Sequence, residues 1–285
     1  MDDIFEKSYL ITGLFMCILA LVNLLTGYDA LIHIYIFMCV GLFVFFDALN
    51  YFNSEEPLIS GNVTALNAGL FIIMTGVVVG FFVELYAAYL ADIWPGMVSA
   101  LNFSDSDFSL QIYALVFLYG LIALPSYSLY TILNNVYSSE VMLRDEFETD
   151  YYRYFVHAGL LLLVLPFGLL FGDFSQLFSF TLFITSMLGL FLIIEYFNFR
   201  RKNQGILLNF FVKNYGRLGV FLSISGLIGL VMAVYVNGFS AISGVPINNI
   251  EILGTPVILI LLCSTVVLVF MSTVSLVSES ELEIQ

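Results

Sequence analysis

Eight long stretches of mostly apolar residues constrain this chain more than any other feature of its sequence. They cover roughly residues 8–26, 30–52, 65–90, 110–133, 155–172, 176–197, 218–236 and 253–277. A helix that crosses a bilayer needs about 20 such residues, because its backbone amides must find partners inside the segment. We therefore expect an all-α, polytopic protein with eight transmembrane helices, which passes several times through the cell membrane.

The composition agrees with that fold class and excludes several others. Hydrophobic residues make up 61% of the chain and charged residues 11%, far from the balance of a soluble domain. The net charge of −14 would repel a phosphate backbone, so we expect no nucleic-acid partner. The first apolar stretch follows MDDIFEK, which lacks a basic region, and we interpret it as a retained span rather than a signal peptide.

The positions of lysine and arginine predict how the chain crosses the membrane, because inner loops are enriched in them. With the N-terminus inside and eight spans, all the cationic residues fall on the inner side: Lys7, Arg144, Arg153, Arg200, Arg201, Lys202, Lys213 and Arg217. An even number of spans also places the C-terminus inside. We therefore predict an N-in, C-in topology.

Cofactor and metal chemistry find little support in the sequence. The three cysteines lie within predicted spans, at spacings that suit neither a disulfide framework nor a metal site. Retinal binding would need a lysine in a span, and haem or metal binding would need clustered histidines. No nucleotide-binding or hydrolase motif occurs. We expect no cofactor and no metal.

The chain also contains an internal repeat. Residues 41–51 (GLFVFFDALNY) and 189–199 (GLFLIIEYFNF) share a pattern, 148 residues apart. Other short matches follow in the same order, and the last aligns Leu124-Pro125 with Thr255-Pro256, 131 residues apart. An even number of helices in each unit would make the repeats parallel. We predict two four-helix repeats, 1–133 and 153–285, joined by an acidic inner linker, 134–152; an acidic tail ends the second repeat.

Two acid–amide pairs occupy equivalent repeat positions. Asp47 and Asn50, like Glu195 and Asn198, are three residues apart, so that each pair shares one helix face. One interpretation is a pseudo-symmetric pair of ligand-binding sites. The other is a structural role at the inner helix ends, where these groups would pair with the 200–202 cations or cap neighbouring helices.

Glu84 is the sharpest candidate for chemistry, because its repeat counterpart is apolar. Apolar surroundings favour the protonated form of a carboxyl group, which suits a general acid or a proton carrier. His33 lies at a similar predicted depth and could be its partner. The alternative for Glu84 is a structural hydrogen bond. Trp94 is a further ligand-binding candidate, although an aromatic residue at the membrane interface is its simpler interpretation; His157 is interpreted as structural.

Several segments resemble a known group of membrane proteins. Residues 46–52 (FDALNYF), 80–86 (GFFVELY) and 94–96 (WPG), with the 195–256 region, resemble a family of duplicated prokaryotic membrane proteins. That family is distantly similar to the lycopene cyclase and carotenoid hydratase membrane proteins. The resemblance implies intramembrane carboxylates that protonate a double bond of a polyisoprenoid. This chain departs from it at Met232-Ala233, where a Trp-Glu pair is expected, so only Glu84 carries over as an acid.

Three functions are compatible with these features. The first is binding or transformation of an isoprenoid or lipid within the bilayer, with Glu84 as the acid. The second is a non-catalytic subunit or scaffold that packs against other membrane proteins. The third is a small-solute or proton-coupled transporter, ranked last because polar residues are not gathered at the midplane of several helices. Membrane lipids, a polyisoprenoid ligand or a membrane protein are thus the expected partners.

Overall fold

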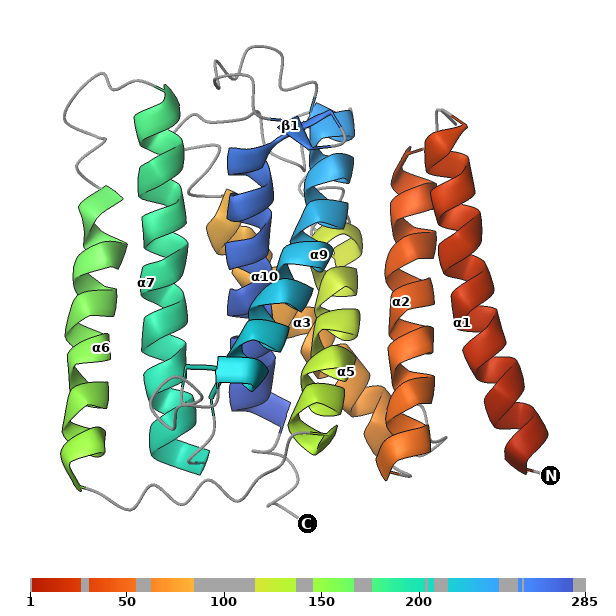
Figure 1. Ribbon diagram of the computed structural model, residues 1–285, viewed down its shortest axis with the longest axis horizontal. Coiled ribbons are helices and arrows are strands. Elements are labelled where there is room, and N and C mark those ends of the chain that lie inside the picture. Colours follow the sequence, from red (N-terminus) through yellow and green to blue (C-terminus); the bar gives the residue numbers. More distant parts are fainter. Residues whose placement is uncertain are drawn as a thin grey trace. The chain divides into compact units, whose positions relative to one another are not determined.

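The computed structural model describes most of the apolar part of the chain. The described residues are 2–26, 31–54, 63–84, 116–136, 146–166, 176–202, 205–207, 215–240, 251–252 and 254–278. Its α-helices are α1 (Asp2–Leu25), α2 (Leu31–Ser54), α3 (Val63–Glu84), α5 (Leu121–Val136), α6 (Glu146–Val164), α7 (Gln176–Lys202), α9 (Tyr215–Ser240) and α10 (Val257–Ser278) (Figure 1). The predicted all-helical class is confirmed, apart from one very short strand pair.

Five of the described helices are long and apolar enough to cross a membrane. The candidate spans are Lys7–Leu25, His33–Phe52, Asn67–Glu84, Phe178–Arg200 and Tyr215–Tyr235, and three shorter apolar helices cover Leu121–Leu133, Arg153–Val164 and Val257–Thr273. The chain is therefore a multi-pass membrane protein. That the three shorter helices also cross the bilayer stays a prediction.

Two helix ends differ from the predicted boundaries. Helix α6 begins at Glu146, inside the stretch predicted as a linker, and carboxylates in a first turn interact favourably with the positive end of the helix dipole. Helix α10 begins only at Val257. The residues before it form a hairpin, in which β1 (Glu251–Ile252) pairs antiparallel with β2 (Thr255–Pro256). Gly254, with φ of 71°, lies in the turn, where a glycine avoids the strain of a positive φ.

The two prolines that the sequence comparison aligned occupy different places. Pro125 lies inside α5, five residues after the end of a π-helical turn, η3 (Val116–Gly120). Pro256 lies in β2, ahead of α10. Pro125 thus lies within a helix and Pro256 immediately before one, and their equivalence in the repeat stays a prediction.

The chain divides into two compact units. The first comprises Met1–Phe81 and Leu101–Ser138, and the second comprises Phe82–Ala100 and Ser139–Gln285. In the first unit α1 lies beside α2, and α2 packs against α5 (Figure 1). In the second, α6 lies beside α7, and α10 lies between α7 and α9 (Figure 1).

Close helix contacts in both units depend on glycines. In the first unit, a Cβ on Gly13 would lie 2.5 Å from the backbone nitrogen of Phe45, and one on Gly80 would meet the Tyr119 side chain. In the second unit, a Cβ on Gly159 would lie 2.7 Å from the carbonyl oxygen of Gly189. Small residues let backbones approach closely, which drives helix association in membranes.

Large apolar side chains remain exposed on the outward faces of several helices. Helix α1 is the clearest case, since only 11% of its candidate span is buried, against 50% for the span of α2. Its exposed residues include Ile11, Leu14, Phe15, Ile18 and Val22. In a membrane protein such a face contacts lipid chains or another protein.

Candidate functional site

The candidate site of the second unit centres on the carboxylate of Glu195. This residue lies in the last third of α7 and is fully buried. Its Oε2 accepts a hydrogen bond from the backbone N–H of Leu207 at 2.8 Å, and its Oε1 accepts one from the hydroxyl of Ser272 on α10. Both carboxylate oxygens are therefore engaged by groups of the protein itself.

The chain returns to Glu195 after α7 has ended at Lys202. Gly205 has φ of 152°, and the next residue, Ile206, is 1% exposed. The backbone N–H groups of Ile206 and Leu207 both face the carboxylate. Residues 205–207 thus fold back along the end of α7, with an apolar side chain in the core and amide groups on a buried acid.

Asn198 completes this cluster. It lies three residues after Glu195 and is also fully buried. Its Nδ2 donates to the carbonyl oxygen of Ser272 at 2.8 Å and to the Ser272 hydroxyl oxygen at 3.0 Å. Ser272 therefore accepts from the amide and donates to the acid. Glu195, Asn198 and Ser272, with the backbone of 206–207, are called the Glu195 cluster below.

Uncharged hydrogen-bond donors of the Glu195 cluster stabilise the buried carboxylate. Among the described side chains, no cation forms an ion pair with Glu195, and Arg200 is exposed. Burying a carboxyl group is costly unless hydrogen bonds replace its water. Here two backbone amides and two side chains do so.

The first unit contains a related arrangement at the other acid–amide pair. Asp47 and Asn50 lie on α2 and are 0% and 3% exposed. The hydroxyl of Tyr9, on α1, donates to Asp47 Oδ2 at 3.3 Å. Asn50 Nδ2 donates to the carbonyl oxygen of Ser128, on α5, at 2.9 Å. As in the second unit, the asparagine binds a serine carbonyl on the following packed helix.

The remaining candidates lie apart from these clusters. Glu84 is 7% exposed at the last residue of α3 and belongs to the second unit, whereas His33 is exposed near the start of α2 in the first. Their pairing stays a prediction. Trp94 lies outside the described residues. His157 is exposed on α6, and its Nδ1 lies 3.0 Å from the carbonyl oxygen of Arg153.

The described residues contain no metal-ligand cluster. No group of three or more histidine, cysteine or acidic side chains in them could hold a metal ion. Cys39 and Cys263 are buried, Cys17 is partly buried, and all three are free thiols.

Sequence analysis missed two of the groups that hold Glu195. Ser272 stands in an apolar helix, where a serine carries no motif. The Leu207 amide is a backbone group, invisible in a sequence pattern. The one available signal was that Ser128 and Ser272 both lie in the fourth long helix of their unit.

The arrangement can hold α7, α10 and residues 205–207 in place. A general acid must reach the atom that it protonates, and neither oxygen of Glu195 is exposed. No protein-family model, curated protein or solved structure matches this chain.

Proposed function

We propose that this integral membrane protein is a non-catalytic subunit or scaffold, built from two equivalent four-helix units. In this proposal the buried carboxylates hold its helices together, and its outer faces pack against other membrane proteins. The observation that carries the proposal is that both oxygens of Glu195 already accept hydrogen bonds from the protein. A carboxylate so engaged is a structural group, because any substrate would have to displace its present partners.

The equivalence of the two units is supported by matching contacts. Helices α1–α2–α5 pack in the same order as α6–α7–α10. Gly13 on α1 contacts Phe45, and Gly159 on α6 contacts Ile193. Phe45 and Ile193 are 148 residues apart, the spacing of the GLF pattern itself.

The asparagine–serine hydrogen bonds suggest how the last helix of one unit aligns in sequence with the last helix of the other. Asn50 and Asn198 are 148 residues apart, and their partners Ser128 and Ser272 are 144 apart. This spacing differs from the 131 residues that separate the aligned prolines. It also aligns Gly120 with Ser264, which lie against α3 and α9 respectively.

Charge supports a docking role on the predicted inner side. The linker 134–152 and the residues after 278 are rich in aspartate and glutamate, whereas the spans are almost free of charge. A partner protein could then contact an acidic surface outside the membrane and, next to it, an apolar helix surface inside the membrane. Electrostatic complementarity of this kind selects partners and speeds association.

The assembly state of the chain in native membranes tests the proposal. A tagged chain should be extracted in a mild detergent and run on a native gel. We expect a stable complex above the 31.9 kDa chain mass, with a second protein in fixed stoichiometry. A monodisperse chain that carries about one polyisoprenoid molecule and no protein would contradict it.

The structural role of Glu195 can be tested separately. Glu195→Gln keeps the shape but replaces one acceptor oxygen by a donor, and should lower the unfolding free energy by about 1–3 kcal/mol. Assembly of the folded fraction should persist. If Glu195→Gln instead left stability unchanged and removed a bound small molecule, the structural assignment would be wrong.

A second candidate function, isoprenoid or lipid binding with Glu84 as the acid, rests on one separate observation. Glu84 is 7% exposed, yet its predicted repeat counterpart, Ala233 or Val234, is apolar. Repeat symmetry therefore does not account for this buried acid. The resemblance to the lycopene cyclase and carotenoid hydratase families would give it a substrate class.

The Glu84 function is tested by lipid mass spectrometry of the purified protein. A polyisoprenoid that co-purifies with wild type and is lost from Glu84→Gln, at unchanged detergent stability, would support it. Glu195→Gln is the matched control, since it also neutralises a buried carboxyl group. Equal loss from both variants, or no polyisoprenoid at all, would contradict a role of Glu84 in binding.

A further inference from the structure

We propose that the first unit binds one ordered water molecule between the hydroxyl of Ser128 and the carboxylate of Asp47. Ser128 lies on α5 and Asp47 on α2, and both side chains are fully buried. The water takes the place that a longer acid and a direct hydrogen bond take in the Glu195 cluster. This inference goes beyond the scaffold function and does not depend on it.

The hydroxyl of Ser128 is the observation that requires a partner. The residue is 0% exposed, and its Oγ forms no hydrogen bond with any of the described residues. The large majority of buried polar side-chain atoms are hydrogen-bonded, to the protein or to ordered water. A hydroxyl that is buried without a partner costs free energy, so a bound water at this atom would stabilise the fold.

The neighbouring hydroxyls of α5 show that Ser128 is an exception. Serine and threonine side chains in helices often bond to the carbonyl oxygen four residues earlier. Ser126 donates in this way to Ile122 at 2.8 Å, and Thr131 to Tyr127 at 3.1 Å. Ser128 forms no such bond to its own helix. Its hydroxyl is therefore left for a partner that the backbone of α5 does not supply.

Asn50 places Ser128 opposite the helix face that carries the acid. Its Nδ2 donates to the carbonyl oxygen of Ser128 at 2.9 Å, and Asp47 lies three residues earlier, on the same face of α2. In the second unit, the matching bond joins Asn198 to the carbonyl oxygen of Ser272 at 2.8 Å, and there the serine hydroxyl also reaches the acid. The same helix face thus meets a serine in both units.

The two acids differ in length by one methylene group. Glu195 is long enough to accept a hydrogen bond from the Ser272 hydroxyl. Asp47 is shorter, and the Ser128 hydroxyl forms no hydrogen bond to it. Two polar groups that face each other across more than hydrogen-bond distance are commonly bridged by a water molecule. The shorter acid therefore accounts for the water site.

A water at this position finds the partners that it needs. A carboxylate has about four acceptor positions, so Asp47 can accept from the water as well as from Tyr9, which donates to its Oδ2. The water also bonds to the Ser128 hydroxyl. Its second hydrogen can go to the side-chain oxygen of Asn50, whose nitrogen is bound to the Ser128 carbonyl. Buried waters typically make about three hydrogen bonds.

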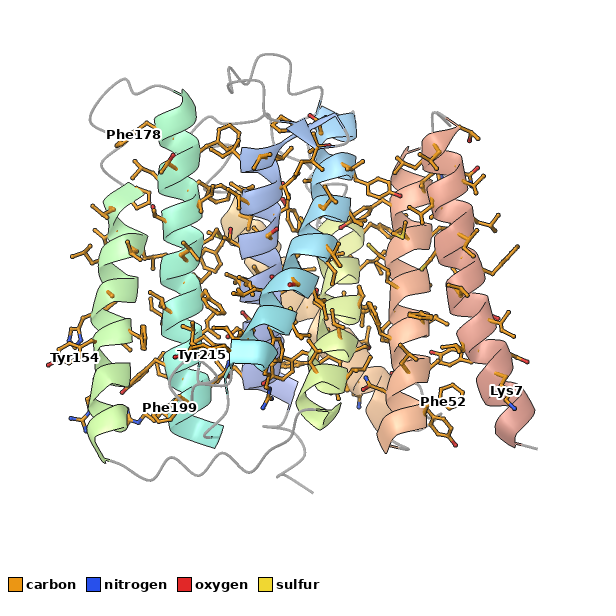
Figure 2. The ribbon with its side chains drawn as sticks, in the orientation of Figure 1. Lys7, Phe52, Tyr154, Phe178, Phe199 and Tyr215 are labelled. Carbon is orange, nitrogen blue, oxygen red and sulfur yellow. The ribbon has the colours of Figure 1, made fainter. Side chains whose placement is uncertain are left out.

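The site lies near an end of its span, where water can reach it. The candidate span of α2 ends at Phe52, and Figure 2 shows Phe52 at the same end of the first unit as Lys7. Asp47 precedes Phe52 by five residues, which is about 8 Å along a helix. A water molecule therefore has a short path from the aqueous phase to the acid.

A structure of the full chain, at a resolution that shows ordered water, tests the site directly. We expect density for one water at about 2.7–3.0 Å from Ser128 Oγ and from a carboxylate oxygen of Asp47. A direct bond between the two side chains, or a Ser128 hydroxyl without a water, would overturn the proposal. Several oxygen ligands at about 2.3–2.6 Å would identify a metal cation instead and would overturn it as well.

The variant Asp47→Glu tests the role of acid length. The longer side chain should displace the water and bond directly to Ser128. Ser128→Ala should then lower the unfolding midpoint more in the Asp47→Glu background than in wild type, because a direct hydrogen bond to a charged group is lost. Ser126→Ala is the matched control and should have the same effect in both backgrounds, since its hydroxyl bonds to its own helix. Equal effects of Ser128→Ala in both backgrounds would contradict the water bridge.

The reciprocal variant, Glu195→Asp, keeps the proposal testable even if Asp47→Glu does not fold. Shortening the acid of the second unit should admit a water between it and Ser272, visible in the structure of the variant. That water would support the assignment of the first-unit site to acid length. A shortened acid that bonds directly to Ser272, or a Ser272 hydroxyl without a water, would overturn it.

Discussion

Asn198 donates its side-chain amide hydrogen to the backbone carbonyl of Ser272, across the contact between α7 and α10. The same serine donates its hydroxyl hydrogen to Glu195. One small residue on the last described helix thus connects an acid and an amide that lie a turn apart. Removing its hydroxyl would leave a buried carboxylate oxygen without its donor.

Ser272→Ala should therefore destabilise the protein. Loss of a partner to a buried charged or polar group costs about 1–3 kcal/mol, and we expect the unfolding free energy in detergent to fall by that amount. The control is Ser264→Ala on the same helix, whose hydroxyl donates only to the carbonyl oxygen of Ile260. If both variants lose the same stability, the bond to Glu195 contributes nothing specific.

Two glycines of α9, three residues apart, should respond differently to alanine. A Cβ on Gly229 would lie 2.6 Å from the backbone nitrogen of Ser264, whereas one on Gly226 would have no heavy atom within 4 Å. Overpacking typically costs about 1–3 kcal/mol, so Gly229→Ala should unfold at a clearly lower temperature. Gly226→Ala should be nearly neutral. If Gly226→Ala instead unfolded at a lower temperature than Gly229→Ala, α9 would not pack on α10 as described.

Tyr9→Phe should weaken the attachment of α1 to α2. The phenol hydroxyl donates to Asp47 at 3.3 Å, and a single hydrogen bond to a charged group contributes about 1.5–3 kcal/mol at good geometry. At this longer distance we expect a loss near 1 kcal/mol. Tyr154→Phe, at a residue 68% exposed on α6, is the comparison and should leave the melting temperature unchanged.

Site-directed labelling tests the predicted N-in, C-in topology. Cys17, Cys39 and Cys263 would be replaced by alanine, and single cysteines introduced at Asn203 and Ser106. A membrane-impermeant maleimide should label the two introduced cysteines from opposite sides, because one predicted loop is basic and inner and the other is outer. Labelling of both from one aqueous phase would refute the topology and, with it, the parallel orientation of the two units.

The helices were predictable because twenty apolar residues in a bilayer have few other structures open to them. The residues at which the helices begin and end were harder to predict. Helix α6 begins among carboxylates that look like a soluble connector, since helix dipoles tolerate acids in a first turn. The hairpin before α10 depends on a single pairing of two-residue strands, which is too short for any periodic pattern to reveal.

For the candidate site, the three-residue spacing correctly indicated that Glu195 and Asn198 share a face. Spacing along one helix cannot identify what the face meets, because that depends on how helices pack. Ser272 and the amide of Leu207 are 77 and 12 residues away from Glu195. The roles of Glu84, His33 and Trp94 stay predictions, and the variant Glu84→Gln tests the first of them.

The position of α10 between α7 and α9 also affects how the protein is made. The ribosome releases α7 and α9 before it completes α10, so Glu195 enters the bilayer while Ser272 is still missing. During that interval an acid in the membrane depends on water, the translocation channel or a chaperone. The second unit can complete the hydrogen bonds to this carboxylate only after α10 has been inserted, so insertion of the last described helix is expected to complete its folding.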